Sequence, residues 1–478
     1  MTSSKDTFSR MPDRQLQAAP KLTWLYLLII TASLAGGVGL VIGDQTVVFA
    51  IILSVLGMAM IILYPFCGLI IFVILNFIRP TDIMPALAVI PLAKIIGGAT
   101  LIALIFSRIR SRDFELGGRQ AVLLIAFAAT LFISVPLSFW PTKSLDVSLD
   151  FLKIILFYLL FVNIVRDLKK LRTITLIAIA CIVVLCLSTI YSFISGDIRA
   201  GSLIGQGMFG DANDVALILV TAIPLTIFYK LKNTPVPYYK IIQWGVIVLL
   251  ILGVVMTKSR GGLLGLLAVV FFMAMKGKNK AIGLVVFLVV IALILMLLPS
   301  EFTDRYSTIG TYNQDASAMG RIYAWQAGIN MMIARPVTGV GVGCFETAFG
   351  LAFRPAGFGA AKWQAPHNTL IQVGGETGLI GLAIFMYLYL YCLMLMRRLQ
   401  PAGTDEQKKK ITLIKDAIFT GLIGFGVSAF FLTQAFNYML YFLIASTASL
   451  TAINSQLMKT TDNNKIENTH ASELKRLN

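Results

Sequence analysis

Long uncharged runs of hydrophobic residues recur along the whole chain, separated by short polar and basic connections. The runs reach about 20 residues, the length at which an α-helix crosses a bilayer, and they lack the polar and apolar alternation of a β-barrel strand. Each run predicts a membrane helix, except the short third run, which could be re-entrant or tilted. About fourteen runs lie near residues 22–42, 46–63, 66–78, 86–106, 120–139, 148–165, 172–194, 213–229, 241–256, 261–275, 281–298, 368–396, 414–433 and 435–456.

The composition favours the same class of fold. Of 478 residues, 57% are hydrophobic and 13% are charged, whereas a soluble domain is about one-quarter charged. We therefore predict an all-α polytopic membrane protein with a bundle of about 12–14 transmembrane helices. The first run, from Leu22, lacks a clear cleavage site and is expected to be a retained helix rather than a signal peptide. The five cysteines are scattered, without metal-ligand spacing, and are expected to be packing residues.

Basic residues gather in short clusters between the runs, which argues against nucleic-acid binding despite the net charge of +17. Cytoplasmic connections of membrane proteins are enriched in lysine and arginine. If the amino terminus is cytoplasmic, every second connection is cytoplasmic too, and the basic clusters then fall on that side. The chain divides accordingly into a cytoplasmic tail (1–21), a first part of the bundle (22–298), a large extracytoplasmic loop (299–366), a last part of the bundle (367–456) and a second cytoplasmic tail (457–478).

Only two histidines occur in the chain. His367 stands where the extracytoplasmic loop enters an apolar run, whereas His470 lies in the polar tail. An unperturbed imidazole changes charge near neutral pH, so His367 at a membrane–water boundary is a candidate for proton transfer. A lone histidine is also commonly a structural hydrogen-bonding residue, and this part of the sequence leaves both interpretations open.

Two arginines flank predicted helices on the extracytoplasmic side, where the positive-inside bias disfavours them, so their presence suggests a specific role. Arg260 stands between two apolar runs, where a guanidinium needs an acidic or phosphate partner, and the adjacent Gly261-Gly262 lets a backbone or a ligand approach closely. Arg321 opens a predicted amphipathic helix at the interface, ended by Pro336, which could contribute to a site or merely cover the bundle. Its apolar positions are Ile322, Trp325, Ile329 and Met332.

Other features of this side have simpler interpretations. Arg305, Arg335 and Arg354 are expected to be solvated or to contact anionic lipid headgroups. The GxGxG run at 339–343 lacks the strand and helix context of a dinucleotide site and predicts a flexible loop.

Two polar stretches could be structural or functional. The turn-rich residues 209–214 are expected to cap the following helix, although Asn213 and Asp214 could also face a sugar. Asp150 and Lys153 lie one helical turn apart and are expected to neutralise each other. The sequence contains no metal-binding cluster, HExxH, GxSxG or P-loop motif, so we expect neither a metal nor another cofactor.

In these residues the chain resembles the O-antigen ligase and polymerase superfamily of bacterial envelopes. The resemblance covers roughly residues 195–400, and its pieces occur in the order found in that family. Each piece is weak alone, whereas their order and their common extracytoplasmic placement make the set fairly specific. The pieces are Phe209 to Asn213, Lys258-Ser259-Arg260-Gly261-Gly262, Gly320-Arg321 with Trp325, Arg335-Pro336 with Gly339 and Gly341, Pro366-His367-Asn368 with Leu370, and Glu376-x-Gly378-Leu379-x-Gly381.

The resemblance implies a glycosyltransferase of the bacterial inner (cytoplasmic) membrane whose active site faces the periplasm. Its donor would be an oligo- or polysaccharide on undecaprenyl diphosphate, and its acceptor the hydroxyl of a sugar or lipid-linked molecule. By position, the resemblance implies that Arg260 and Arg321 bind the diphosphate and that His367 is the catalytic base. Further candidates at the site are Lys258, Asn213, Asn368 and Glu376.

This chemistry suits the residue types. A diphosphate is a good leaving group, two guanidiniums can stabilise its developing charge without a metal, and a neutral imidazole can accept the proton of a hydroxyl. Attack opposite the leaving group would invert the anomeric centre. The moderate length of the loop favours a polymerase or polysaccharide ligase over a protein O-oligosaccharyltransferase. A transporter or flippase of lipid-linked saccharides is the alternative, and it should show ionisable residues deep in its helices and paired repeats. In this sequence the predicted helices are nearly free of charge and the two halves show no repeat.

Overall fold

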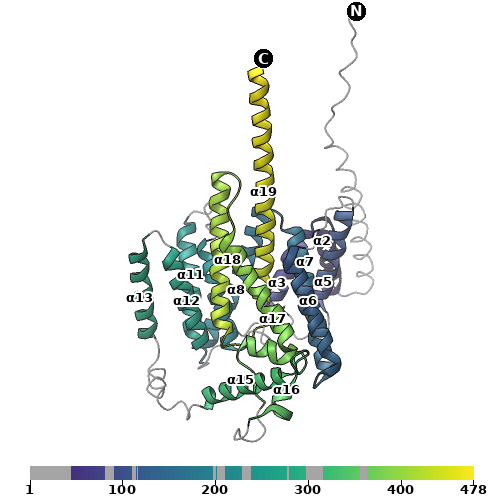
Figure 1. The fold of residues 1–478 in the computed structure, drawn as a ribbon, viewed down its shortest axis with the longest axis vertical. Helices are drawn as coiled ribbons and strands as arrows, with labels where there is room; N and C mark the ends of the chain where they lie inside the picture. Colours follow the sequence, from purple (N-terminus) through teal and green to yellow (C-terminus); the bar gives the residue numbers. More distant parts are fainter. Residues whose placement is uncertain are drawn as a thin grey trace, which may run out of the picture.

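The computed structural model describes residues 45–80, 91–109, 115, 117–196, 201, 210–228, 238–276, 279–297, 316–355 and 363–477. Throughout these ranges the secondary structure is helical and no strand occurs. Most helices run side by side between the two ends of one bundle, and α15 and α16 cover one of these ends (Figure 1). We call this the α15 end; the C-terminus of α19 lies on the opposite side. The chain is an all-α polytopic membrane protein, as the sequence predicted.

The described helices follow the apolar runs of the sequence, one helix to a run, with α15, α16 and two short turns of other helix types between them. Their bounds are α2 Gln45–Leu63, α3 Pro65–Ile78, α5 Leu92–Ile109, α6 Gly118–Ser134, η2 Val135–Leu137, α7 Pro141–Ile164, α8 Leu168–Ile194, α10 Ala212–Phe228, α11 Tyr239–Met256, α12 Arg260–Lys276, α13 Lys280–Leu297, α15 Ala316–Ala334, α16 Phe345–Ala348, η4 Phe349–Phe353, α17 Thr369–Arg398, α18 Asp405–Ala429 and α19 Tyr438–Leu477.

Three helices extend well beyond the predicted runs. α7 begins at Pro141 and α18 at Asp405, each about two turns before the start of its apolar run. α19 continues to Leu477, through the segment that was expected to be a tail. These extensions are polar, so hydropathy alone did not include them. The first predicted run, near residues 22–42, lies outside the described residues.

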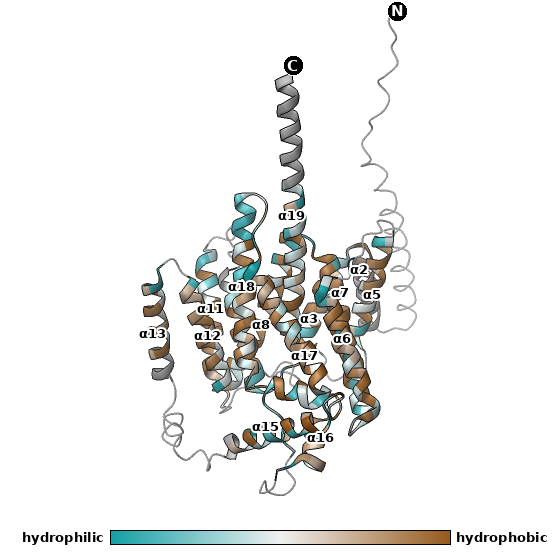
Figure 2. Ribbon diagram, viewed as in Figure 1, coloured by the Kyte–Doolittle hydropathy of each residue, from teal (hydrophilic) through white to brown (hydrophobic). Residues whose placement is uncertain are grey.

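Six of the described helices are long and apolar enough to cross a membrane. Figure 2 shows apolar residues along the middle of the bundle and hydrophilic ones towards its two ends. The charged residues within α7 behave as predicted, since Lys153 Nζ lies 2.6 Å from Asp150 Oδ1 and the two charges neutralise each other. The arrangement is that of a multi-pass protein, while the total number of spans stays a prediction. The six helices are α6 with the following turn, α7, α8, α11, α17 and α18.

α10 and the first half of α19 form the centre of the bundle. Residues 215–226 of α10 and 439–450 of α19 are all buried. A helix that is apolar on every side is expected at a centre of this kind. Aromatic rings pack edge-to-face beside α19, with ring centroids 5.4 Å apart for Phe127 and Phe151 and 5.6 Å apart for Phe151 and Tyr441. This packed centre supports the turns at the α15 end.

α15 confirms the helix predicted around Arg321, and small residues form its packed side. Ala324, Ala327 and Met331 are fully buried, whereas Ile329, expected on the apolar face, is 47% exposed. The small alanines let α15 lie close to the bundle. Ile329 lies on the side of the helix away from these residues, and the predicted interfacial placement of α15 stays a prediction.

The GxGxG run at 339–343 is an ordered connection, and the prediction of a flexible loop was wrong. Its amides bond to carbonyls of α17, as Gly341 N does to Glu376 O at 3.0 Å. All three glycines have positive φ, and a Cβ on Gly341 would collide with Ser138. The glycines are therefore required by close packing, and this connection joins α17 to the segment between α6 and α7.

The arginines expected to be solvated contact the protein instead, where the structure describes them. Arg335 donates to the carbonyl of Leu137 at 2.5 Å, and its guanidinium lies 4.8 Å from the centroid of the Phe139 ring. Arg354 donates to a carbonyl one turn earlier in its own segment, at 3.1 Å. Arg305 lies outside the described residues.

Candidate functional site

The turn between α18 and α19, residues 430–437, is held against the start of α17 at the α15 end of the bundle. Thr369 Oγ1 donates to Leu432 O at 2.7 Å and accepts from Gln434 N at 3.1 Å. Ala435 N donates to the side-chain oxygen of Gln372 at 3.1 Å. Residues more than sixty positions apart in sequence are thereby held in one place.

His367 lies directly beside this turn, half-buried, one residue before the cap of α17. Its backbone N–H donates to Thr433 Oγ1 at 3.1 Å. Its φ is +43°, in the left-handed region that residues other than glycine seldom occupy. Asn368 caps α17, because its Oδ1 accepts from Leu370 N at 2.8 Å and from Ile371 N at 3.1 Å. Asn368 therefore fixes the helix start, and with it the position of the histidine.

Arg260 is the exposed first residue of α12. The glycines after it permit close packing: a Cβ on Gly261 would lie 3.1 Å from Phe431 Cβ, and one on Gly262 2.5 Å from Ala216 Cβ. The glycine backbone therefore allows close contact at this position, as the sequence indicated, and the groups in contact with it are side chains of the protein itself.

The turn that carries Lys258 and Arg260 is tied to the tip of α10. Ser259 Oγ donates to Asn213 Oδ1 at 2.8 Å and accepts from the first turn of α12. Asp211 caps α10 by accepting from the backbone N and the side chain of Asn213, both at 2.8 Å. The capping interpretation of this stretch is thus confirmed, with Asp211 as the cap. Asn213 thereby positions the turn before Arg260. In the same turn, Lys258 Nζ lies 5.9 Å from the centroid of a phenylalanine ring of α8.

The tip of α10 also contacts the α18–α19 turn. Gln434 Nε2 donates to Asp214 Oδ1, and Gln434 Oε1 accepts from Asn437 Nδ2 at 2.5 Å. All three side chains are largely buried. A buried network of this kind holds its members in one arrangement, because breaking it leaves polar groups without partners.

α15, the helix that carries Arg321, contacts the same turn through Trp325. Trp325, one helical turn after Arg321 and hence on the same side of α15, donates from its ring N–H to Pro366 O at 3.0 Å. The Trp325 ring packs edge-to-face against Phe430, with centroids 5.8 Å apart. α15 is therefore fixed both to the residue before His367 and to the α18–α19 turn.

One turn thus contacts all three candidate elements. Phe430 contacts α15, Phe431 contacts the start of α12, and Thr433 contacts the backbone of His367. The structure brings the segments of Arg260, Arg321 and His367 to the same end of the bundle, around one set of contacts. Guanidinium groups can bind a phosphate and an imidazole can accept a proton, so segments carrying these side chains at one end of the bundle make a candidate site.

A family model described as O-antigen ligase matches residues 245–386. In this segment the chain is similar to the O-antigen ligase family. The similarity supports a glycan-transferring membrane enzyme of the O-antigen ligase and polymerase type. The match runs from α11 into α17 and includes Arg260, Arg321 and His367, whereas Asn213 lies before it. No curated protein sequence matches the chain significantly.

Glu376 belongs to the matched O-antigen ligase segment but not to this set of contacts. Its side chain is buried and faces the backbone N–H groups of Gly343 and Phe345. Two residues later, Gly378 has a φ of +74° and kinks α17. Cys344, beside Glu376, is buried as a packing residue, and burial raises the pKa of its thiol. This part of the O-antigen ligase motif therefore shapes α17 below the site.

Some residues that position the candidate site were not singled out in the sequence. Thr433, Gln434 and Asn437 lie where two predicted apolar runs almost meet, so no polar segment drew attention to them. Their polar side chains between hydrophobic runs were the available signal. Among the described residues, no group of three or more histidine, cysteine, aspartate or glutamate side chains could hold a metal ion.

Proposed function

We propose that this protein transfers an oligo- or polysaccharide from an undecaprenyl-diphosphate carrier to an acceptor hydroxyl, as an O-antigen or exopolysaccharide ligase or polymerase. The observation that carries the proposal is the α18–α19 turn, which contacts the segments of Arg260, Arg321 and His367 within the O-antigen ligase match. In this proposal the site faces the periplasm, both termini are cytoplasmic, and the membrane is the bacterial inner membrane.

Arg260 and Arg321 bind the diphosphate of the donor. Guanidinium groups pair with phosphate oxygens through two parallel hydrogen bonds and keep their charge at any physiological pH. As the bond between the anomeric carbon and the phosphate oxygen breaks, negative charge grows on the leaving diphosphate, and these cations stabilise it most at that moment. Lys258, in the turn before Arg260, adds a further positive charge at the same rim.

His367 acts on the acceptor. Its neutral imidazole takes the proton of the acceptor hydroxyl while that oxygen bonds to the anomeric carbon from the side opposite the diphosphate. The products are the glycosylated acceptor with inverted configuration, undecaprenyl diphosphate and a protonated imidazole that returns its proton to water. The step needs no metal, because the arginines supply the positive charge. Asn368, Asn213 and Glu376 act through position: the first two fix the histidine and arginine turns, and the third fixes α17.

The test is substitution of each residue in the purified, reconstituted enzyme with a lipid-linked glycan donor. His367→Ala is expected to lower the rate of transfer by about a hundred- to ten-thousandfold, and Arg260→Ala or Arg321→Ala to abolish measurable transfer, at unchanged membrane abundance. Arg397→Ala is the matched control, since this exposed arginine lies at the other end of α17. Wild-type rates in the three site variants would remove the assignment.

Transport of the lipid-linked saccharide is the alternative function, and the same preparation separates the two. Turnover of the donor by protein in detergent, with no membrane barrier, excludes transport as the sole activity. Glycan lengths in a deletion strain then separate the two enzyme classes. Loss of long chains with single repeat units retained favours a polymerase, whereas accumulation of lipid-linked polymer with nothing attached favours a ligase.

A further inference from the structure

The indole ring of Trp363 lies flat on Gly350, a residue of η4. A Cβ on Gly350 would lie 3.0–3.2 Å from three consecutive atoms of the Trp363 ring, Cδ2, Cε3 and Cζ3, and the middle atom is the nearest. An approach from the edge of the ring would leave the two outer atoms clearly farther away than the middle one, so the glycine lies over the face of the ring. Only a residue without a side chain allows this contact.

The other face of the ring is open. Trp363 is 57% exposed although one of its faces lies on Gly350. Among the described residues, no hydrogen-bond partner contacts its ring N–H or the side-chain amide of the half-buried Gln364, which follows it. The support beneath the ring is fixed, because Arg354 donates to Gly350 O at 3.1 Å. A firmly held aromatic face, with unused hydrogen-bonding groups beside it, is therefore presented to the outside.

The segment of Trp363 and Gln364 connects this aromatic face to the candidate site. The Gln364 amide lies over Gly320, the residue before Arg321, because a Cβ on Gly320 would be 3.4 Å from Gln364 Nε2. In the other direction the chain reaches His367 four residues after Trp363, which is at most about 14 Å of extended backbone. A glycan that reacts between Arg321 and His367 therefore has the Trp363 ring within reach of its next few units.

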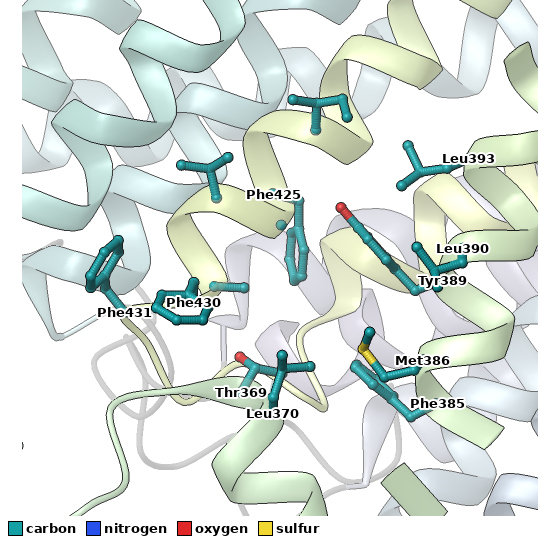
Figure 3. Close-up of a pocket in the computed structure, with 14 residues that line it drawn as sticks. Thr369, Leu370, Phe385, Met386, Tyr389, Leu390, Leu393, Phe425, Phe430 and Phe431 are labelled. Atoms are coloured by element: carbon teal, nitrogen blue, oxygen red, sulfur yellow. The ribbon is translucent and has the colours of Figure 1, made fainter. Parts of the chain in front are cut away.

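A second direction from the site is unsuited to a glycan. An apolar cavity of about 470 Å³ lies between α17 and α18, and Thr369 and Leu370, just after His367, are among its lining residues (Figure 3). The hydroxyls of its two hydroxyl-bearing residues, Thr369 and Tyr389, already donate to backbone carbonyls. Sugar hydroxyls would lose water there without gaining partners, which is unfavourable. The glycan of a substrate therefore extends in another direction, and the segment of Trp363 offers one.

We propose that Trp363 and Gln364 form a sugar subsite, in which a pyranose ring of the donor's glycan stacks on the open face of Trp363. The inference rests on the proposed function, which puts the donor's diphosphate at Arg321 and hence its glycan beside Gln364. A pyranose ring presents C–H groups on its faces and hydroxyls at its edge. The C–H groups pack on the electron-rich face of an aromatic ring, and the hydroxyls bond to the ring N–H and to the amide.

Insertion of this corner into the outer leaflet is the competing explanation, because tryptophan is also common at membrane surfaces. Leu351, next to Gly350, is 67% exposed and would insert together with Trp363. Two observations favour the sugar. Polar side chains, Gln364 and Arg354, lie beside the ring. In addition α16, which directly precedes η4, covers the α15 end and is remote from the apolar middle of the bundle (Figure 1).

The experiment measures binding to the full-length protein in phosphatidylethanolamine nanodiscs. One probe is the undecaprenyl-diphosphate-linked glycan extracted from a strain that lacks this protein, and the other is undecaprenyl diphosphate without a sugar. Trp363→Ala removes the ring, Trp363→Phe keeps an aromatic face, and Gln364→Ala removes the amide. Trp140→Ala is the matched control, because Trp140, directly before α7 at the same end of the bundle, is similarly exposed, at 53%.

We expect Trp363→Ala to weaken binding of the lipid-linked glycan about tenfold, the effect of losing one aromatic stacking contact. Trp363→Phe should restore most of the affinity, Gln364→Ala should weaken binding severalfold, and Trp140→Ala should match the wild type. Binding of the sugar-free probe should not change in any variant, which also shows that the variant is folded. If Trp363→Ala does not bind the sugar-free probe at all, Gln364→Ala decides.

Brominated lipid tests the competing explanation. The fluorescence of Trp363 is obtained as the difference between the wild type and Trp363→Phe. This fluorescence should change when the lipid-linked glycan is added, and brominated lipid in the nanodisc should not quench it.

Three results would overturn the inference. Unchanged affinity for the lipid-linked glycan in a variant that still binds the sugar-free probe would show that the sugar lies elsewhere. An equal partial loss for both probes would show that these residues act on the lipid or the diphosphate. Quenching of Trp363 by brominated lipid would assign the ring to the membrane. Failure of the proposed function is distinguishable, because it would appear as absent glycan transfer in the wild type while the two probes still report whether Trp363 binds a sugar.

Discussion

Replacing Thr369 with valine tests whether one hydroxyl holds the α18–α19 turn on the start of α17. Valine keeps the shape of threonine and removes only the hydrogen-bonding group. The hydroxyl donates to Leu432 O at 2.7 Å and accepts from Gln434 N at 3.1 Å, and Thr369 is only 3% exposed. Both backbone groups therefore lose this partner in a place that water reaches poorly.

The expected loss of stability follows from these two groups. A buried polar group left without its partner destabilises a protein by about 1–3 kcal/mol, so two of them lower the free energy of unfolding by about 2–6 kcal/mol. The turn also holds the backbone of His367 through Thr433, at 3.1 Å. Transfer activity should therefore fall as well, since small displacements of a catalytic group reduce rates strongly.

The assays are thermal unfolding in detergent and glycan transfer by reconstituted protein. Thr451→Val is the control, because the Thr451 hydroxyl donates at 2.8 Å to the carbonyl of Thr447 within the same helix. Such a bond within a helix contributes little to stability. Thr369→Val should melt at a clearly lower temperature than the control and transfer glycan more slowly. Equal melting temperatures and equal rates would refute the role assigned to the hydroxyl.

Two further substitutions test the positions of α17 and α15. Gly378→Ala should lower the yield of folded protein, measured by size-exclusion chromatography, because the φ of Gly378 is +74° and a Cβ there would lie 2.5 Å from the carbonyl oxygen of Pro336. Gly98→Ala is the control and should be neutral, because nothing lies within 4 Å of a Cβ on Gly98. Trp325→Phe keeps a ring against the α18–α19 turn but removes the 3.0 Å hydrogen bond to Pro366 O, so transfer should slow by about tenfold at normal protein abundance. An unchanged rate would show that this bond does not position the site.

The bundle could be predicted because long hydrophobic runs identify membrane helices in a sequence. α10 and α17, for example, begin within one residue of their predicted runs. Polar helix ends carry no such signal, which is why α18 and α19 are longer than predicted. The packed side of α15 was also hidden, since small alanines face the bundle there and Ile329 does not. Close packing selects small residues as readily as large hydrophobic ones, so a stripe of large apolar residues does not identify the side that packs on the bundle.

The candidate residues could be found in the sequence because a charged or titratable side chain is unfavourable at a membrane boundary. The turn that contacts all their segments could not be found in this way. An arginine at a membrane boundary and a lone imidazole after a loop are conspicuous one by one. Their segments are held together by the α18–α19 turn, whose residues form no recognisable motif. The partners of these residues are distant in sequence: Gln434 pairs with Asp214, 220 positions away. Such pairings depend on how α10, α17 and α18 pack, and hydropathy does not predict which helices pack together. The chemistry at the rim thus rests on the hydrophobic centre, because only that packing brings distant polar turns to one place.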